Sequence, residues 1–230
     1  MKSEILKGIQ HEFLGRNGGF SSGLFSTLNC SKFVGDTQEA VQKNLDYARN
    51  VVGAEKLITL NQVHGAECLL VDENTESDQK ADAMVTKTPG IALGILTADC
   101  VPALFFDSKN KIIGAAHAGW KGAVAGVLES TVKSMISQGS QPTDILVALG
   151  PCIHVDSYEV DEEFIANFDD KSCFCTINGR YHFDIVKYCI ERLKKCEITN
   201  IEVVNIDTCA YNDEYFSYRH ARKFSNGVCG

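Results

Sequence analysis

The sequence is poor in basic residues and in long apolar segments, and each deficit excludes a class of protein. Its 22 Lys and Arg are outnumbered by 30 Asp and Glu, which gives a formal net charge of −8. Binding to a phosphate backbone needs clustered Lys and Arg, and the longest basic grouping, Arg219 to Lys223, is small. We therefore expect no nucleic-acid partner. A run of roughly 18 apolar residues, as a membrane-spanning helix requires, is also absent, so we expect no membrane partner.

The sequence also has no recognisable export signal and no interdomain linker. Met1-Lys2-Ser3-Glu4 leads into no apolar segment, so we expect a cytoplasmic protein whose ten irregularly spaced cysteines are reduced. The one polar interruption, residues 72–80, is short enough to be a surface loop. We therefore expect residues 1–230 to form a single domain with a sizeable core, as a monomer or a homodimer.

The apolar pattern predicts short buried strands with helices interspersed among them. Helices are expected from an Asp36 cap to Val52, from Gly122 to about Ser137, and from Phe183 to Lys194. Short apolar runs predict strands at 57–60, 68–71, 83–85, 91–96, 103–106, 112–116, 145–149 and 201–206. The alternation is too irregular for strict βαβ units, so the fold class is α/β or α+β with mixed sheets.

Three short motifs place one metal-binding side chain each after a predicted strand. They are Asn61-Gln62-Val63-His64-Gly65, Thr97-Ala98-Asp99-Cys100 and His117-Ala118-Gly119-Trp120. Loops at strand ends commonly reach a shared crevice, and catalytic zinc keeps three protein ligands and one open position. The sequence therefore predicts a metalloenzyme with His64, Cys100 and His117 as ligands.

Simpler interpretations of the same residues remain open. His64 can be a turn histidine, and Cys100 can be a buried thiol. Asp99 favours a functional site, because a carboxylate beside a thiol is costly to bury without a partner. A metal-free hydrolase is a further alternative, with Cys100 as nucleophile, His117 as base and Asp99 or Asn61 orienting the imidazole. A non-enzymatic binding module is hard to reconcile with three potential ligands.

Several named activities do not fit the residues. Six histidines are too few for the copper centres of a multicopper laccase, and no Met follows at a spacing suited to the axial ligand of a blue-copper site. The cytidine-deaminase signature also fails, because Gly65-Ala66-Glu67 follows His64 and no second Cys stands at Val155.

Further motifs together with these three resemble the YfiH-type family, known as polyphenol oxidase or "laccase domain" proteins and as purine nucleoside phosphorylases. The additional motifs are His11 to Gly19, Val34-Gly35-Asp36, Gly150-Pro151-Cys152-Ile153 and Phe216-Ser217-Tyr218-Arg219. The resemblance implies a layered α/β/β/α domain that holds zinc, with copper as the alternative. It implies phosphorolysis of adenosine, inosine or methylthioadenosine, together with deamination of adenosine. For the hydrolase alternative, it implies an amide or ester substrate, for example in editing peptidoglycan precursors.

The resemblance also suggests roles for individual residues. Asp99, Cys100 and His117 would be catalytic, with Asp99 transferring protons or supporting the metal. Lys121 follows a Gly-rich strand-to-helix turn that would suit an anion, although the family usually has Arg there. The full set expected to bind the nucleoside and phosphate is Arg16, Asn61, Gln62, Lys121 and Arg219. After Arg219 the chain departs from the family pattern, which continues with a second Arg and an Asp.

Overall fold

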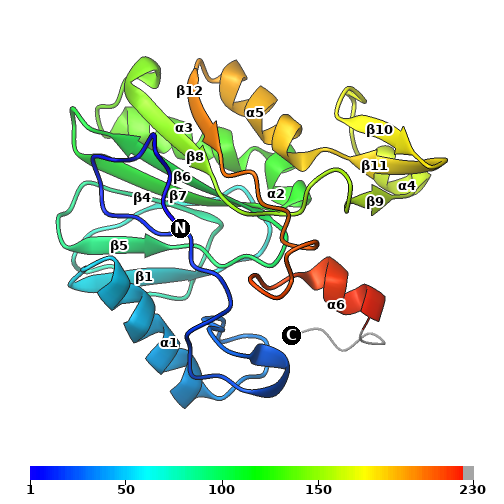
Figure 1. Cartoon of the computed structure of the whole chain (residues 1–230). Coiled ribbons are helices and arrows are strands. Elements are labelled where there is room, and N and C mark those ends of the chain that lie inside the picture. Colours follow the sequence, from blue (N-terminus) through cyan, green and yellow to red (C-terminus); the bar gives the residue numbers. More distant parts are fainter. Residues whose placement is uncertain (225–230) are drawn as a thin grey trace.

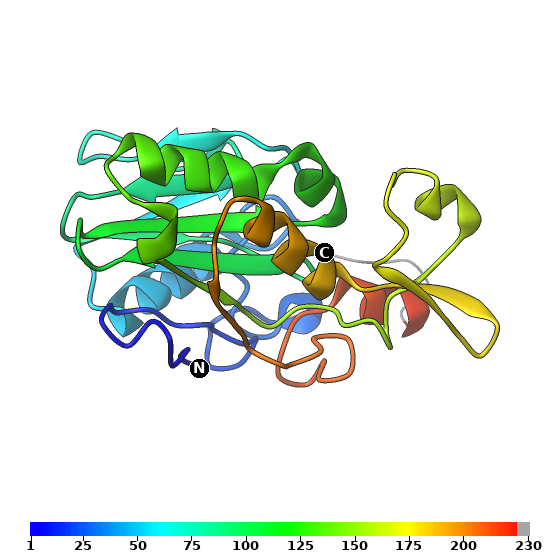
Figure 2. The ribbon, with the colours of Figure 1, turned by 90° about the horizontal axis from the view of Figure 1, so that it is seen from above.

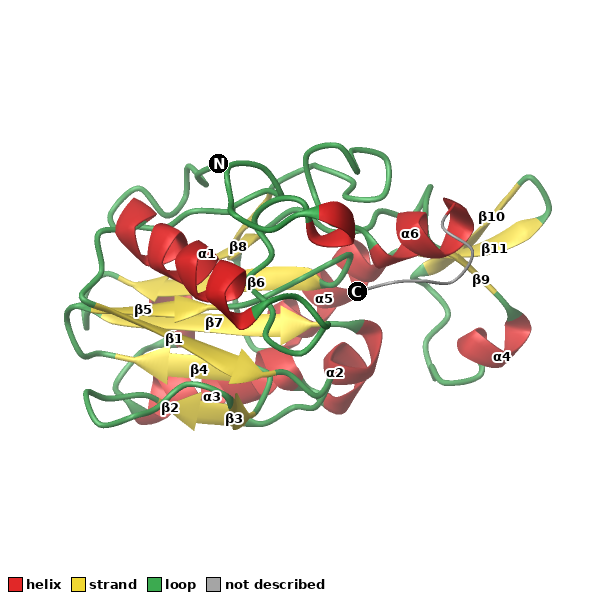
Figure 3. Ribbon diagram, turned by 90° about the horizontal axis from the view of Figure 1, so that it is seen from below, coloured by secondary structure: helices red, strands yellow, loops and turns green. Residues whose placement is uncertain are grey.

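Two β-sheets lie face to face in the structure, and helices cover their outer faces (Figure 1). The structure is a computed structural model that describes residues 1–224. Helix α1 (Gln38–Val51) packs on the three-stranded sheet, and α3 (Val127–Ser137) and α5 (Ile185–Lys195) pack on the six-stranded sheet (Figure 3). The expected mixed α/β fold with α/β/β/α layers is therefore confirmed.

The smaller sheet has the strand order β3-β1-β5 and is parallel throughout. Its strands are β1 (Lys56–Asn61), β3 (Gln79–Lys80) and β5 (Ile91–Gly94). An apolar cluster joins this sheet to the larger one, with Ile58, Leu60 and Ile91 packed against Met84. The short β3 lies within the predicted surface loop at residues 72–80.

The larger sheet is mixed and has the strand order β12-β8-β6-β7-β4-β2. Its strands are β2 (Cys68–Leu70), β4 (Ala83–Thr86), β6 (Val101–Asp107), β7 (Ile112–Ala118), β8 (Ile145–Leu149) and β12 (Asn200–Val203). In its centre β7 runs antiparallel to both β6 and β4, with Val101 opposite Ala118 and Ala83 opposite Ala116. This register brings the residues that precede β6 and β4 beside the carboxyl-terminal end of β7.

The helix predicted from Gly122 to Ser137 is wrong in one respect, because the chain forms two helices there. Helix α2 (Trp120–Ala125) ends at Gly126, whose φ of 98° is left-handed, and α3 begins at the next residue. The cap of α1 also differs from the prediction. Thr37, rather than Asp36, accepts the hydrogen bond from the Ala40 amide, whereas Asp36 accepts hydrogen bonds from the amide of Thr37 and the side chain of Asn29.

A lobe that the apolar pattern did not predict projects from one end of the sheets (Figure 2). It contains the antiparallel sheet β10-β11-β9 and α4, and the aromatic rings of Phe164, Phe168, Phe174 and Phe183 pack together within it. The elements are β9 (Glu159–Val160), α4 (Glu162–Ile165), β10 (Phe174–Ile177) and β11 (Arg180–Phe183). Helix α6 (Tyr218–Phe224) and the short 3-10 helices Gly23–Phe25 and Pro142–Asp144 complete the described chain.

Within residues 1–224, two further expectations concern the cysteines and membrane-spanning helices. All nine cysteines in this range are free thiols, as expected; Cys229 lies outside the described residues. No helix within the range is long and apolar enough to cross a membrane.

Candidate metal centre

The three predicted ligands, which come from separate parts of the chain, meet at one point. His64 lies in the turn after β1, Cys100 directly precedes β6, and His117 is near the end of β7. Their ligand atoms all lie within 4.8 Å of one another, with Cys100 Sγ 4.0 Å from His64 Nε2. The two imidazole rings cross at 76° with their centroids 4.7 Å apart. The antiparallel pairing of β6 with β7 places Cys100 beside His117, and β1 brings His64 from the other sheet.

Gly119 allows these side chains to approach one another. A Cβ atom at this position would lie 2.8 Å from both Cys100 Sγ and His64 Cδ2, well inside van der Waals contact. The glycine of the His117-Ala118-Gly119-Trp120 motif is therefore needed for space rather than for a left-handed backbone. Its φ is −69°, which any residue can adopt.

Asp82, which lies outside the three sequence motifs, contacts both histidine segments. It is fully buried, and its Oδ1 atom is 2.8 Å from His117 Nδ1. The carboxylate also accepts hydrogen bonds from the backbone amides of Val63, His64 and Gly65. A sequence signal was available, because a carboxylate within the apolar run Ala81–Val85 needs buried partners. The hydrolase hypothesis also needs a correction here, since Asp82, not Asp99 or Asn61, orients the His117 imidazole.

The charges of the group are strongly coupled. Burial raises the pKa of the Cys100 thiol, but hydrogen bonds to His117 and His64 outweigh burial and lower it to about 7. Burial lowers the pKa of His117, yet the hydrogen bonds to Asp82 and Cys100 outweigh this effect and raise it to about 9. A thiol with a depressed pKa supplies thiolate, which is both a metal ligand and a nucleophile.

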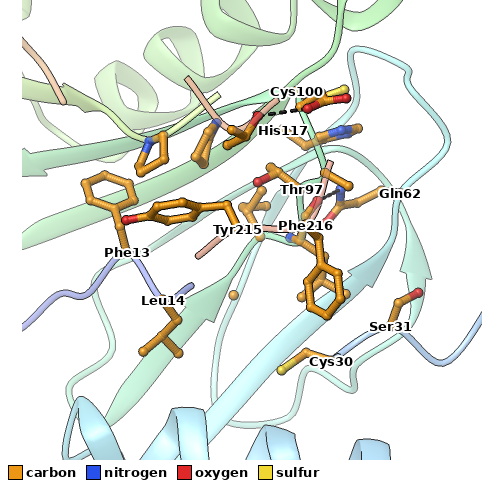
Figure 4. A pocket seen from close by; sticks show the side chains of 18 of the residues that line it. Phe13, Leu14, Cys30, Ser31, Gln62, Thr97, Cys100, His117, Tyr215 and Phe216 are labelled. Atoms are coloured by element: carbon orange, nitrogen blue, oxygen red, sulfur yellow. Dashed lines mark hydrogen bonds between the residues drawn. The ribbon is translucent and has the colours of Figure 1, made fainter. Parts of the chain in front are cut away.

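All nine predicted site residues line one cavity of about 1650 Å³. In Figure 4, Cys100 and His117 lie at one end of this cavity, and Phe216, Cys30 and Ser31 lie further along it. His117 is buried, Cys100 is half-buried and His64 is exposed. The group therefore opens into a space large enough for a small-molecule substrate. The predicted residues with this location are Arg16, Asn61, Gln62, His64, Asp99, Cys100, His117, Lys121 and Arg219.

Asp99 is turned into the protein next to the ligand loop. Its carboxylate accepts hydrogen bonds from Thr208 Oγ1 at 2.8 Å and from the Arg219 amide at 2.6 Å, and its φ is 96°. Burial raises the pKa of Asp99, although these hydrogen bonds oppose the shift. Of the two roles that the sequence allowed, this geometry favours support of the site, because both carboxylate oxygens already have protein donors.

Gln62 joins two of the ligand-bearing loops. Its side-chain amide donates to the Leu96 carbonyl at 2.7 Å and accepts from the Leu96 amide at 2.8 Å. This pair of bonds connects the loop of His64 to the segment that leads to Asp99 and Cys100. Gln62 lines the cavity as predicted, but its strongest contacts are with the backbone. Asn61, the residue before Gln62, is the last residue of β1 and also lines the cavity.

The three predicted cations differ in their contacts with the protein and in their exposure. Arg16 donates to the carbonyls of Ser26 and Asn212, and its guanidinium lies over the Phe216 ring. Arg219 donates to the carbonyls of Ser157 and Glu159 and lies over the Tyr158 ring. Lys121 is exposed beside the Trp120 ring. Lys121 is therefore the predicted cation that is most accessible to an anion in the cavity.

The donor set fits a transition metal. Asp82 at His117 Nδ1 leaves Nε2 as the free ring nitrogen, and a carboxylate partner of this kind is common for metal-binding histidines. Two nitrogens and one thiolate suit zinc or copper. Within residues 1–224, this is the one group of three or more His, Cys, Asp or Glu side chains arranged to hold an ion.

The motifs and the geometry agree with the comparisons with known proteins. A family model described as multi-copper polyphenol oxidoreductase laccase matches residues 10–230. A relative from Escherichia coli, named purine nucleoside phosphorylase YfiH, is 34% identical in an alignment of 223 positions that covers 93% of this chain and 89% of the relative. The chain belongs to the YfiH-type family.

Other YfiH-type proteins support the same assignment. A relative from Deinococcus radiodurans, named purine nucleoside phosphorylase, is 34% identical in an alignment of 215 positions that covers 92% of this chain and 83% of the relative. The crystal structure of the Bacillus licheniformis hypothetical protein YfiH superposes with a TM-score of 0.84 at 29% identity, covering 90% of this chain and 85% of that one. YlmD from Geobacillus stearothermophilus gives 0.83 at 27% identity, with 90% and 84% covered. The resemblance that the motifs indicated is therefore confirmed.

Proposed function

We propose that this protein is a zinc-dependent purine nucleoside phosphorylase. Its substrates would be adenosine, inosine and methylthioadenosine, and it would also deaminate adenosine. The observation that carries the proposal is the group of His64, Cys100 and His117 in the wall of a substrate-sized cavity. The names of the YfiH-type relatives support the substrate class. Copper remains the alternative metal, since the same donor set suits both.

The residues around the group have distinct proposed tasks. His64, Cys100 and His117 would hold the zinc, with Cys100 as thiolate. Bound zinc would polarise an attacking phosphate or water and lower the pKa of such a water toward ~7. Lys121 is exposed and lines the cavity, so it would attract the phosphate.

The remaining residues would shape the site. Arg16 and Arg219 would form cationic walls, because each guanidinium is held in place by backbone carbonyls. Gln62 would keep the His64 loop fixed against Leu96, beside Asn61. Asp99 would support the Cys100 loop through Thr208 and the Arg219 amide.

Product analysis tests the proposal directly. Purified protein would be incubated with adenosine, with and without phosphate. Phosphorolysis yields adenine and ribose 1-phosphate only when phosphate is present, whereas deamination yields inosine without it. Elemental analysis of protein purified without added metal should give about one zinc per chain. Release of neither base nor inosine by zinc-loaded protein would refute the proposed activities.

A second candidate, a cysteine hydrolase acting on an amide or ester, is favoured by a specific arrangement. Cys100, whose pKa is lowered to about 7 by His117 and His64, lies beside His117, and His117 Nδ1 is 2.8 Å from Asp82 Oδ1, in the order of a nucleophile, a base and an orienting carboxylate. This enzyme would keep its activity in chelator and lose it to thiol alkylation. A zinc enzyme would lose activity in chelator and recover it when zinc is restored.

A further inference from the structure

Asp82 gathers four N–H groups around one buried carboxylate. Oδ1 lies 2.8 Å from His117 Nδ1 and accepts from the His64 amide at 2.9 Å. Oδ2 accepts from the amides of Gly65 at 2.7 Å and Val63 at 3.1 Å. The side chain has no exposed surface. Hydrogen bonds from four surrounding donors help to offset the cost of burying this charge.

These contacts fix two of the three proposed ligands. The bond to His117 Nδ1 leaves Nε2 as the free nitrogen of that ring and sets its orientation. The three consecutive amides bind the turn in which His64 has a φ of 58°, a left-handed conformation that is uncommon for a residue with a side chain. His117 belongs to the larger sheet and His64 follows a strand of the smaller one. A single carboxylate thus fixes the positions of two proposed ligands, one from each sheet, relative to one another.

We infer that Asp82 is a positioning residue, which sets the geometry of His64 and His117 together and thereby the affinity of the site for a divalent transition metal. This inference rests on the proposed metal site and assigns no direct metal contact to Asp82. Carboxylate partners of metal-binding histidines typically change metal affinity by roughly 10- to 100-fold when they are removed. Here the effect should lie at the upper end, because two ligands depend on one side chain.

The variant Asp82→Asn removes the negative charge and one acceptor oxygen but keeps nearly the same side-chain shape. Asparagine is nearly isosteric, but it offers one acceptor oxygen, and its NH₂ group would point at two of the four N–H donors. At least two donors would therefore lose their partner. Competition with a chromophoric chelator should show zinc binding weakened by roughly 100-fold relative to the wild type. In the cobalt(II)-loaded variant, the visible absorption bands should also shift, because the ligands no longer hold the same geometry.

Asp107→Asn is the matched control. Asp107 is also fully buried and accepts hydrogen bonds from the Lys109 amide, the Asn110 amide and the Asn110 side chain. It ends β6, at the opposite end of that strand from Cys100. This variant should lose stability, as any disturbed buried carboxylate does, but should bind zinc as tightly as the wild type. If zinc binding were weakened equally in both variants, Asp82 would have only a structural role and no specific effect on the metal site.

Measurements on the wild-type protein cover the case in which Asp82→Asn fails to fold. Amide hydrogen exchange in the zinc-free protein should show slow exchange at residues 63–65, although the side chains of Val63 and His64 are exposed. Fast exchange there, or unchanged zinc affinity in a folded Asp82→Asn, would overturn the inference. Absence of zinc binding by the wild type would instead refute the metal site itself, so the two failures are distinguishable.

Discussion

Gly119 is the position where an added methyl group should damage the metal group most directly. In Gly119→Ala the new Cβ would lie 2.8 Å from both Cys100 Sγ and His64 Cδ2, so these ligands must separate. We expect zinc content to fall sharply while the fold is retained, as measured by elemental analysis and circular dichroism. Gly65→Ala is the neighbouring control, because its methyl group would meet atoms no closer than 3.5 Å. Similar zinc loss in both variants would contradict the steric explanation.

The hydrogen bonds of Asp99 predict a mild phenotype for Asp99→Asn. A lost proton donor or acceptor typically slows turnover by roughly 10²–10⁴-fold. Because Thr208 and the Arg219 amide already occupy both carboxylate oxygens, we expect zinc binding to persist and kcat to fall by less than that range. Thr208→Val should give a comparable decrease, since it disturbs the same support. A loss of more than 10²-fold in Asp99→Asn alone would restore the proton-transfer role.

At the scale of elements, Gly126 separates α2 from α3. Its φ of 98° is costly for other residues, although a Cβ there would make only ordinary contacts, at 3.6 Å from Arg192 and Glu129. We expect Gly126→Ala to lower the free energy of unfolding by about 1–2 kcal/mol. Gly126→Asn should lose less, because Asn tolerates left-handed conformations better. Chemical denaturation measures both, and zinc content should not change.

The N-terminal segment is tied to β12 through Glu202, and this connection should depend on pH. The Glu202 carboxylate accepts hydrogen bonds from Ser3 and from the amides of Glu4 and Ile5. Burial opposes ionisation, but these bonds outweigh it and lower the pKa of Glu202 below its ordinary 4.5. A lowered pKa stabilises the fold above the unfolded-state pKa, and this contribution is lost as the pH falls through the folded-state value.

Glu202→Gln tests this dependence. At pH 7 the variant should unfold with a free energy about 1 kcal/mol lower than that of the wild type. The difference should shrink as the pH falls below 4.5 and the wild-type carboxylate becomes protonated. Urea unfolding at several pH values measures it. A difference that stays constant down to pH ~3 would show that the charge of Glu202 is not involved.

Which elements could be predicted depended on whether their apolar residues form a local pattern. The central strands are continuous apolar runs, and β6 and β7 were found for that reason. The strands β9 and β10 contain no fully buried residue and few consecutive apolar residues, so they gave no such signal. The break at Gly126 was missed because the apolar stripe continues across it from Val124 to Val127.

At the scale of the whole molecule, the proposed metal joins the two sheets. His64 follows a strand of the smaller sheet, whereas His117 lies near the end of β7 in the larger sheet and Cys100 directly precedes β6. Zinc should therefore bind the folded chain far more tightly than the unfolded chain. At a free zinc concentration 100 times the Kd, the gain in stability would be about 2.7 kcal/mol, measurable as a rise in Tm. Cys100→Ser should show a smaller rise. An unchanged Tm in the wild type would contradict a site of this kind.

The three residues of the proposed metal site could be proposed from sequence because each lies in a short, distinctive motif. Their convergence could not be derived from spacing, since it depends on the register of β6 with β7 and on the packing of two sheets. A carboxylate inside an apolar run marks Asp82 as buried, but its partners could not be predicted, because three of the four are backbone amides, which have no sequence signature. The hydrogen bonds of Asp99 and Gln62 are likewise to partners far along the chain.

The left-handed conformations of His64 and Asp99 lower the stability of the folded chain at two positions that form the site. With φ values of 58° and 96°, both positions would suit glycine better on steric grounds alone. Yet glycine would remove a proposed ligand at one position and the support of the Cys100 loop at the other. Selection or engineering for thermal stability alone would therefore tend to erase the site. A stabilised version of this enzyme must keep these two unfavourable residues and gain its stability elsewhere.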